Sequence, residues 1–255
     1  TLARSLADRA VLASSTHEAA LYAMASLQEH ENADARGALA GVLDRSGPRL
    51  EWQSRPGISC TDLQYSADGR FLACAGYMND VVIWDMTTGA QAARFGEGAA
   101  AWRLAYSPDG QTLAAGRMDG EVRLYRPSDG TELARLVGPR DTVVDLTYAP
   151  DGHRIAGASI DGTVVVWELP GGNEVARLQG RCMQHYGLAF SPDGSRLATG
   201  CMDGEVLLWQ PETGVEPTSL GSHSRDISGV AFAPDGARLV TSSDDGEVAV
   251  WDVDA

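Results

Sequence analysis

The chain has 255 residues and a formal net charge of −15, from 20 basic and 35 acidic side chains. All the basic residues are arginines, and the absence of lysine excludes a Walker-type phosphate loop and Schiff-base catalysis. The acidic balance excludes a nucleic-acid partner, because phosphate backbones need a basic surface. No apolar run is long enough to cross a membrane and the N-terminus has no secretion signal, so we expect no membrane association and a cytoplasmic location.

Residues 1–47 are rich in alanine, leucine and arginine, which are good helix formers. Apolar side chains recur at helical spacing within 2–10, 20–27 and 35–43, and Ser14-Ser15-Thr16 offer N-cap oxygens before the second stripe. We predict three short amphipathic helices, which form either a connector to an upstream module or a cap on the following domain.

From residue 57 onward one turn recurs at a nearly fixed interval. Its aspartates are 41, 42, 42 and 42 residues apart, which marks an array of stacked supersecondary units. The five copies are Ser66-Ala67-Asp68-Gly69, Ser107-Pro108-Asp109-Gly110, Ala149-Pro150-Asp151-Gly152, Ser191-Pro192-Asp193-Gly194 and Ala233-Pro234-Asp235-Gly236.

Each unit is predicted to contain four short strands. In the fourth copy, apolar runs at 187–190, 196–200 and 205–209 are separated by the recurring turn and by Asp203-Gly204. An Asp-Gly pair favours a tight hairpin with positive φ at both central residues. Other copies add a fourth strand after a further glycine, as in Leu133–Leu136 after Gly130.

An aromatic residue closes each third strand, and twice it is followed by aspartate, in Trp84-Asp85 and Trp251-Asp252. This pattern resembles the WD-repeat signature over roughly residues 57–254. The resemblance implies an all-β fold, a WD-repeat β-propeller of four-stranded blades. An ordinary β-sandwich would not keep the fixed period.

Many WD repeats carry a hydrogen-bonded set of histidine, serine or threonine, aspartate and tryptophan. His223 lies 22 residues before Asp245 and 28 before Trp251, so the last repeat is similar to that set, with Ser242 or Ser243 as the hydroxyl. We therefore interpret His223 as structural.

The last repeat has no fourth strand, and the alternating segment 48–55 around Trp52 is predicted to supply it and close the ring. Residues 48–255 would then form one propeller domain of five blades, fewer than the seven usual in the family. Either a small ring forms or the chain belongs to a longer array.

Residues 1–47 look like the helical connector that precedes WD arrays in large bacterial signalling proteins. The chain begins with Thr1, and its arginine-only basic residues favour a GC-rich bacterial coding sequence. We expect the C-terminal part of a larger bacterial signalling or defence protein.

The four cysteines, Cys60, Cys74, Cys182 and Cys201, show no CxxC spacing. Only Cys182 has a histidine nearby in sequence, His185, which is half a metal site, so we expect reduced thiols and no metal or cofactor. No nucleophile–base pair is recognisable, and the repeated aspartates serve turn geometry. We predict that the protein is not an enzyme.

The favoured function is a protein–protein interaction scaffold or sensor module, whose partner is another protein or an upstream domain of the same polypeptide. The alternative is a small-ligand or glycan-binding, lectin-like propeller. Family resemblance places the hairpins between second and third strands on one face with the loops leading into the first strands. Aromatic, methionine and arginine side chains at these positions are typical of interfaces. The predicted contact residues are Tyr77, Trp102, Arg103, Arg117, Met118, Tyr186 and Met202.

Overall fold

The computed structural model describes residues 60–76, 81–96, 99–179, 182, 184–213 and 215–254. The predicted helical segment 1–47, the predicted closing strand at 48–55 and the first hairpin turn at Met78-Asn79 lie outside these residues. The described residues form strands and turns only, so none of them belongs to a helix able to cross a membrane.

The strands form five antiparallel sheets, each built from strands consecutive in sequence, as the repeats predict. The strands are β1 (Cys60–Tyr65), β2 (Phe71–Gly76), β3 (Val81–Asp85) and β4 (Ala90–Phe95) in blade 1; β5 (Ala101–Tyr106), β6 (Leu113–Arg117), β7 (Val122–Tyr125) and β8 (Glu132–Leu136) in blade 2; β9 (Val143–Tyr148), β10 (Arg154–Ser159), β11 (Thr163–Glu168) and β12 (Asn173–Gln179) in blade 3; β13 (His185–Phe190), β14 (Leu197–Cys201), β15 (Glu205–Trp209) and β16 (Thr218–Ser222) in blade 4; and β17 (Ile227–Phe232), β18 (Arg238–Ser243) and β19 (Val248–Asp252) in blade 5.

The recurring turn forms as its residue types predict. The Gly110 N–H donates to the Ser107 carbonyl at 2.8 Å, and the Asp109 carboxylate accepts from Ser107 Oγ at 2.6 Å and from the Gln111 N–H at 3.0 Å. These bonds satisfy the backbone at the tip and fix the hairpin.

The Asp-Gly turns differ from the expected tight turn. At Asp119-Gly120 the glycine N–H donates to the Arg117 carbonyl, and the Arg117 N–H donates to the Glu121 carbonyl. Gly120 takes the last position of the turn, with φ 84°. The positive φ therefore falls on a single bulge glycine and not on the two central residues of the turn.

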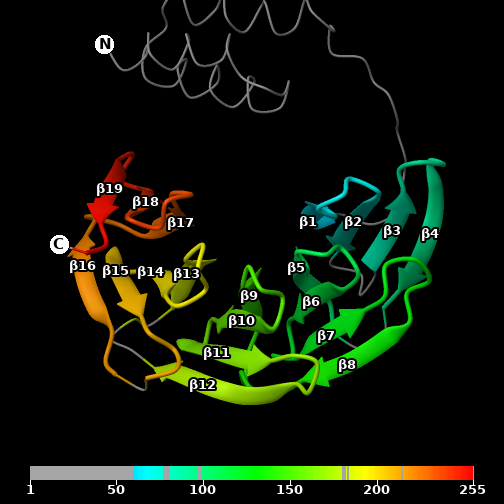
Figure 1. Ribbon diagram of the computed structural model, residues 1–255, viewed down its shortest axis with the longest axis horizontal. Coiled ribbons are helices and arrows are strands. Elements are labelled where there is room, and N and C mark those ends of the chain that lie inside the picture. Colours follow the sequence, from blue (N-terminus) through cyan, green and yellow to red (C-terminus); the bar gives the residue numbers. More distant parts are fainter. Residues whose placement is uncertain are drawn as a thin grey trace, which may run out of the picture. The chain divides into compact units, whose positions relative to one another are not determined.

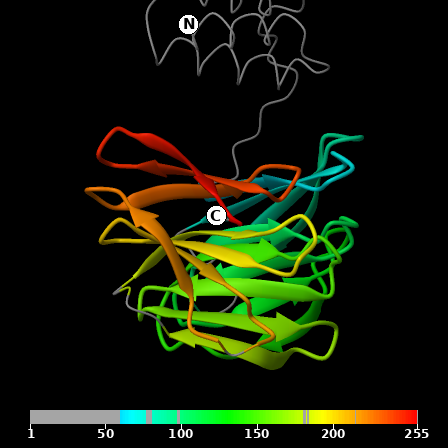
Figure 2. The same ribbon diagram turned by 60° about the vertical axis from the view of Figure 1, so that its left-hand side comes forward.

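The five blades lie in sequence order with their first strands inside an arc and their fourth strands outside (Figure 1). Figure 2 shows the sheets stacked face against face. Contacts between first strands run from β1 to β5, β9, β13 and β17. The described blades leave the arc open between blade 5 and blade 1 (Figure 1). Ring closure by residues 48–55 stays a prediction.

The hydrophobic core lies between consecutive blades. Val164 and Val166 of β11 pack with Leu188 and Phe190 of β13 in one buried cluster, and equivalent clusters join the other blades. The backbones approach closely: a Cβ on Gly200 of β14 would lie 2.3 Å from a side-chain carbon of Ile227 in blade 5. Stacking therefore buries most side chains of the second and third strands in blades 1 to 4.

Polar bonds join the inner strands of neighbouring blades. Asp62 accepts from the Leu104 N–H at 2.8 Å, Arg103 donates to the Val144 carbonyl at 2.7 Å, and Asp145 accepts from the Leu188 N–H at 2.7 Å. Burial raises the pKa of the Asp145 carboxyl to about 6, although two backbone N–H groups oppose the shift. The folded chain therefore holds this proton more tightly than the unfolded chain does.

Replacing Asp145 by asparagine should remove a pH dependence of stability. Between pH 4 and 6 the native carboxyl binds more proton than the unfolded one, so its contribution to stability falls as the pH rises. The unfolding free energy of the wild type, relative to Asp145→Asn, should decrease by roughly 2–3 kcal/mol across this window. Urea denaturation at several pH values measures this, with Asp244→Asn at an exposed position as the control.

Candidate functional site

The hairpin between the second and third strands of a blade is bonded to the loop leading into its first strand. The N–H groups of Met118, Ile160, Met202 and Asp244 donate to loop carbonyls at 2.9–3.1 Å in blades 2 to 5. The two kinds of segment therefore share one side of the arc, as predicted. We call this side the hairpin face and define it by Trp102, Met118, Ile160, Tyr186 and Met202.

The hairpin face carries apolar side chains at the tips of its turns. Met118 and Met202 are each 44% exposed, and Ile160 between them is half-buried. Trp102 is half-buried at a β-bulge in β5, and half-buried Tyr186 donates its hydroxyl to Gln184 at 3.2 Å. A bulge redirects a side chain out of the regular alternation. These residues come from blades 2, 3 and 4.

The predicted arginines are placed differently. Arg117 is 2% exposed, with Nε 3.5 Å from an Asp119 oxygen, so it supports the hairpin from inside and cannot be a surface contact as predicted. The pattern missed this because all five residues of β6, including the last, are buried between neighbouring sheets. Arg103 is half-buried, and its Nε–H donates to the Val144 carbonyl of the neighbouring blade. Tyr77 lies outside the described residues.

His223 belongs to a hydrogen-bonded set in blade 5, but its hydroxyl partner is Thr241, and the prediction of Ser242 or Ser243 was wrong. The Trp251 Nε1–H donates to Thr241 Oγ1 at 2.8 Å, which leaves the threonine hydrogen for His223 Nε2, also at 2.8 Å. His223 Nδ1 then donates toward Asp245 at 3.3 Å. Thr241 and Ser243 both lie on the buried face of β18, but the Ser243 hydroxyl donates to the Arg225 carbonyl at 3.1 Å, and Ser242 lies on the other face.

A cavity of about 610 Å³ opens between blades 2 and 3 on the opposite side, beside the recurring turns. At the next two blade boundaries an arginine bridges to an acid: Arg154 to Glu212 at 2.8 Å, and Arg196 to Asp254 at 2.7 Å. Thr112 and Pro170 occupy the equivalent positions here, so no bridge fills the space. Sequence inspection missed this cavity, although the repeat alignment contained its signal.

The cavity gives limited support to a glycan site. Its only aromatic lining residue is Tyr148, whose hydroxyl is buried without a hydrogen-bond partner among the described residues, and burial raises the pKa of that hydroxyl. Leu124, Leu133 and Leu169 form much of the remaining wall. Asp109 and Asp151 also line the cavity, but both carboxylates accept hydrogen bonds within their own turns, and a sugar site would offer several aromatic platforms as well.

The expectation of reduced thiols is wrong for this structure. Cys60 is bonded to Cys74 and Cys182 to Cys201, with Cα–Cα distances of 5.6 and 5.5 Å. In each case the hairpin between the first and second strands of the blade brings the two cysteines together. Their separations of 14 and 19 residues in the sequence did not suggest these pairings.

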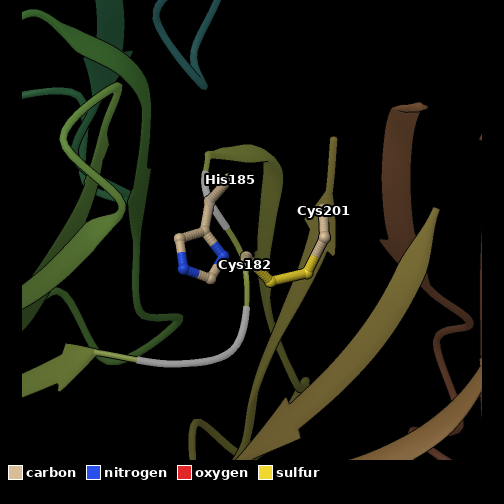
Figure 3. A group of neighbouring side chains, drawn as sticks. All are labelled: Cys182, His185 and Cys201. Atoms are coloured by element: carbon tan, nitrogen blue, oxygen red, sulfur yellow. A yellow bond between two sulfur atoms is a disulfide. The ribbon is translucent and has the colours of Figure 1, made fainter. Parts of the chain in front are cut away.

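His185 lies beside the second disulfide (Figure 3). It is fully buried, and neither ring nitrogen has a hydrogen bond of good geometry within the described structure. Burial lowers the pKa of His185 to about 4, while the Gly162 backbone and Asp203 oppose the shift. The ring is therefore neutral at pH 7, and its edge packs against Trp209 with centroids 6.4 Å apart.

Comparison with known families matches a model described as "WD domain, G-beta repeat" over residues 93–126, 130–168, 173–210 and 214–252. The matched repeats span more than half of the chain. This chain belongs to the WD40 repeat family. WD40 domains generally act as protein-interaction scaffolds and are usually non-catalytic.

Two curated relatives match a short part of this chain. Coronin-7 from Homo sapiens is 45% identical over 62 residues, and Coronin-7 from Pongo abelii is 44% identical over 62 residues. Each match covers 24% of this chain, and the chain spans 7% of the length of each relative.

A solved structure, the computationally designed Ika8 protein, has the same fold with a TM-score of 0.67 and 24% sequence identity. The match covers 75% of this chain and 57% of the designed chain.

The hydrogen-bonded set of Trp251, Thr241 and His223 in blade 5 should stabilise the fold more than the smaller set in blade 4, which has only the tryptophan–threonine bond. Thr199 accepts a single bond from Trp209, at 2.9 Å, whereas Thr241 serves both Trp251 and His223. Thr241→Val should lower the free energy of unfolding by about 3 kcal/mol and Thr199→Val by about 1 kcal/mol, because buried donors lose partners without a change of shape. Urea denaturation of the two variants measures the difference, and equal losses would contradict it.

Proposed function

We propose that this WD40 domain is a non-catalytic protein–protein interaction scaffold that binds its partner on the hairpin face. One observation carries the proposal: Met118 and Met202 expose 44% of their surface at turn tips, where solvated turns favour polar residues. Ile160 lies at the equivalent turn of the blade between them. Methionine adapts its shape to a partner, and such surfaces are common in protein recognition.

The neighbouring side chains support an asymmetric protein partner. Trp102 and Tyr186 lead into blades 2 and 4, but the equivalent position in blade 3 is the buried Val144. Aromatic anchors of this kind dominate the energy of protein interfaces. Their unequal placement fits a single macromolecular surface better than a ligand repeated blade by blade.

The charges around the hairpin face suggest which charges its partner carries. Three exposed aspartates lie beside the apolar turn tips: Asp119, Asp161 and Asp203. One carboxylate oxygen of each accepts a hydrogen bond from a backbone N–H of its own turn. An apolar surface with a rim of arginine or lysine would match them. The same acidic rim disfavours a nucleic acid.

Site-specific photocrosslinking in the host cell tests the location of the interface. A photoreactive amino acid at position 118 or 202 should crosslink to the same protein, whereas one at exposed Gln111 or Ser195, on the side of the recurring turns, should not. Equal crosslinking from both sides, or none from the hairpin face, would contradict the proposal.

Replacement of the aromatic anchors should weaken binding without unfolding the domain. Trp102→Ala and Tyr186→Ala should each weaken the affinity for the crosslinked partner about thirtyfold, since such anchors contribute roughly 2 kcal/mol or more. Arg94→Ala and Arg135→Ala, on the exposed outer strands β4 and β8, should leave the affinity unchanged. Titration calorimetry measures both, and the reverse pattern would place the partner on the outer rim.

The wider context is also a proposal: this domain belongs to a larger bacterial signalling or defence protein. The arginine-only composition and the alanine-rich residues 1–47 support it. Sequencing the complete reading frame tests it, and an archaeal or eukaryotic gene, or one without an effector domain, would contradict it.

A further inference from the structure

Three potential metal ligands meet at the start of blade 4. Cys182 precedes β13, His185 is the first residue of β13, and Cys201 ends β14 directly opposite His185 in the strand register. Their ligand atoms lie within 4.8 Å of one another, and the side chains are 0–5% exposed. Figure 3 shows the imidazole next to the two sulfurs.

The ring nitrogens of His185 indicate that this cluster lacks a ligand, because both are buried without a hydrogen bond of good geometry in the described part of the chain. A buried ring nitrogen without a partner costs free energy, and native proteins rarely leave one unpaired. His223, the other buried histidine of the described residues, uses both nitrogens on Thr241 and Asp245. Neither ring nitrogen of His185 makes a hydrogen bond of good geometry among the described residues, although the Gly162 backbone lies close enough to favour the protonated ring, and the two sulfurs are the other potential metal ligands of this cluster.

We propose that reduction of the Cys182–Cys201 disulfide creates a Zn²⁺ site formed by Cys182, His185 and Cys201. A dithiol reductant supplies two electrons and two protons, breaks the S–S bond and is itself oxidised to a disulfide. Binding of Zn²⁺ then releases the two thiol protons, because thiolates are the ligands. Two thiolates and one neutral imidazole fill three tetrahedral positions, and water or an outside ligand takes the fourth.

The Cys60–Cys74 disulfide provides an internal control. Cys60 and Cys74 belong to no group of three potential ligands among the described residues. A general affinity of reduced cysteines for metal would include this pair, whereas the proposed site would not.

Cobalt substitution tests the site in the reduced full-length chain. One Co²⁺ per chain should produce the thiolate-to-cobalt absorption band, and one equivalent of Zn²⁺ should abolish it. Cys201→Ser should remove the band, and His185→Phe should weaken Co²⁺ binding at least about tenfold. Cys60→Ser should leave the band and the stoichiometry unchanged.

Circular dichroism melting identifies any variant that fails to fold, and His185→Phe retains all four cysteines. The proposal is overturned if the reduced wild type gives no thiolate–cobalt band, if His185→Phe binds as tightly as the wild type, or if Cys60→Ser abolishes the band. It is also overturned if the oxidised chain binds Co²⁺ equally well.

An independent observation concerns the two end blades of the arc. Val248 and Val250 of β19 are 70% and 62% exposed, whereas their equivalents in blade 4, Val206 and Leu208, are 0% and 8% exposed. In blade 1, Leu63 is 56% exposed, but the equivalent leucines of the next three blades are buried. The exposed faces thus repeat surfaces that are covered at every internal boundary.

Arg238 gives the same indication. Its equivalents Arg154 and Arg196 each reach an acid on the following blade, whereas Arg238 pairs with Asp235 of its own blade at 3.2 Å, with its side chain 62% exposed. The outer face of blade 5 therefore has both the apolar and the charged groups that bind a following blade.

We infer that blade 5 of one chain docks on blade 1 of a second copy, in place of the closure within one chain that residues 48–55 were predicted to provide. The free face of blade 5 is equivalent to the face with which each earlier blade packs against the next blade in sequence. The free face of blade 1 is equivalent to the face with which each later blade packs against the blade before it. The contact is therefore head-to-tail, with different patches on the two copies. Thr87 stands in blade 1 where blades 4 and 5 have acids, so Arg238 gains no ion pair at this position and the apolar side chains carry the contact.

Complementation between variants tests this association. Sedimentation velocity should show the wild type assembling with rising concentration, and Val248→Asp/Val250→Asp and Leu63→Asp/Tyr65→Asp should each be monomeric. An equimolar mixture of the two variants should form heterodimers and nothing larger, because each retains one intact face. Val137→Asp, at a valine 70% exposed elsewhere, should assemble like the wild type. A wild type that is monomeric throughout, or variants that still self-associate, would overturn the inference.

Discussion

Every blade of this protein depends on its neighbours, because a four-stranded sheet of this composition has two apolar faces and can cover neither by itself. The buried clusters accordingly lie between sheets, as with Val164 and Val166 against Leu188 and Phe190. Close backbone approach at Gly200 and the bonds from Asp62, Arg103 and Asp145 follow from that stacking. The same dependence explains why side chains become exposed where the stack of described blades ends.

The informative positions are those where one blade departs from the others. Ser159 and Ser243 tie their strands to a loop carbonyl at 3.0 and 3.1 Å, whereas Cys201 occupies the equivalent position in blade 4. A covalent bond to Cys182 thus replaces a hydroxyl–carbonyl hydrogen bond, and it brings sulfur next to a histidine. Thr112 stands at the position of the two bridging arginines, Arg154 and Arg196, and a cavity of about 610 Å³ lies beside it between blades 2 and 3.

These departures lie on a frame that is locally rigid. The turn aspartates satisfy their own backbones, and Asp161 and Asp245 also accept an N–H from the preceding loop at 2.8 and 2.9 Å. The hairpins and loops of the hairpin face are therefore fixed to one another before any partner arrives. Preorganised surfaces lose less conformational entropy on binding, which suits a scaffold.

The sequence by itself determined the repeat, the strands and the turns, because these depend on local preferences: proline and glycine at defined turn positions, and alternation within runs such as 205–209. The family resemblance implied which hairpins and loops share a face, and the fixed period then placed equivalent residues of successive blades at equivalent positions.

Only the tertiary structure decided the burial of Arg117, the choice of Thr241 over the neighbouring serines, the pairing of the cysteines and the cavity beside Thr112. Each depends on which way a side chain points across a strand, or on what the adjacent blade places opposite it. Those are contacts between residues distant in sequence, and the period of a repeat does not encode them.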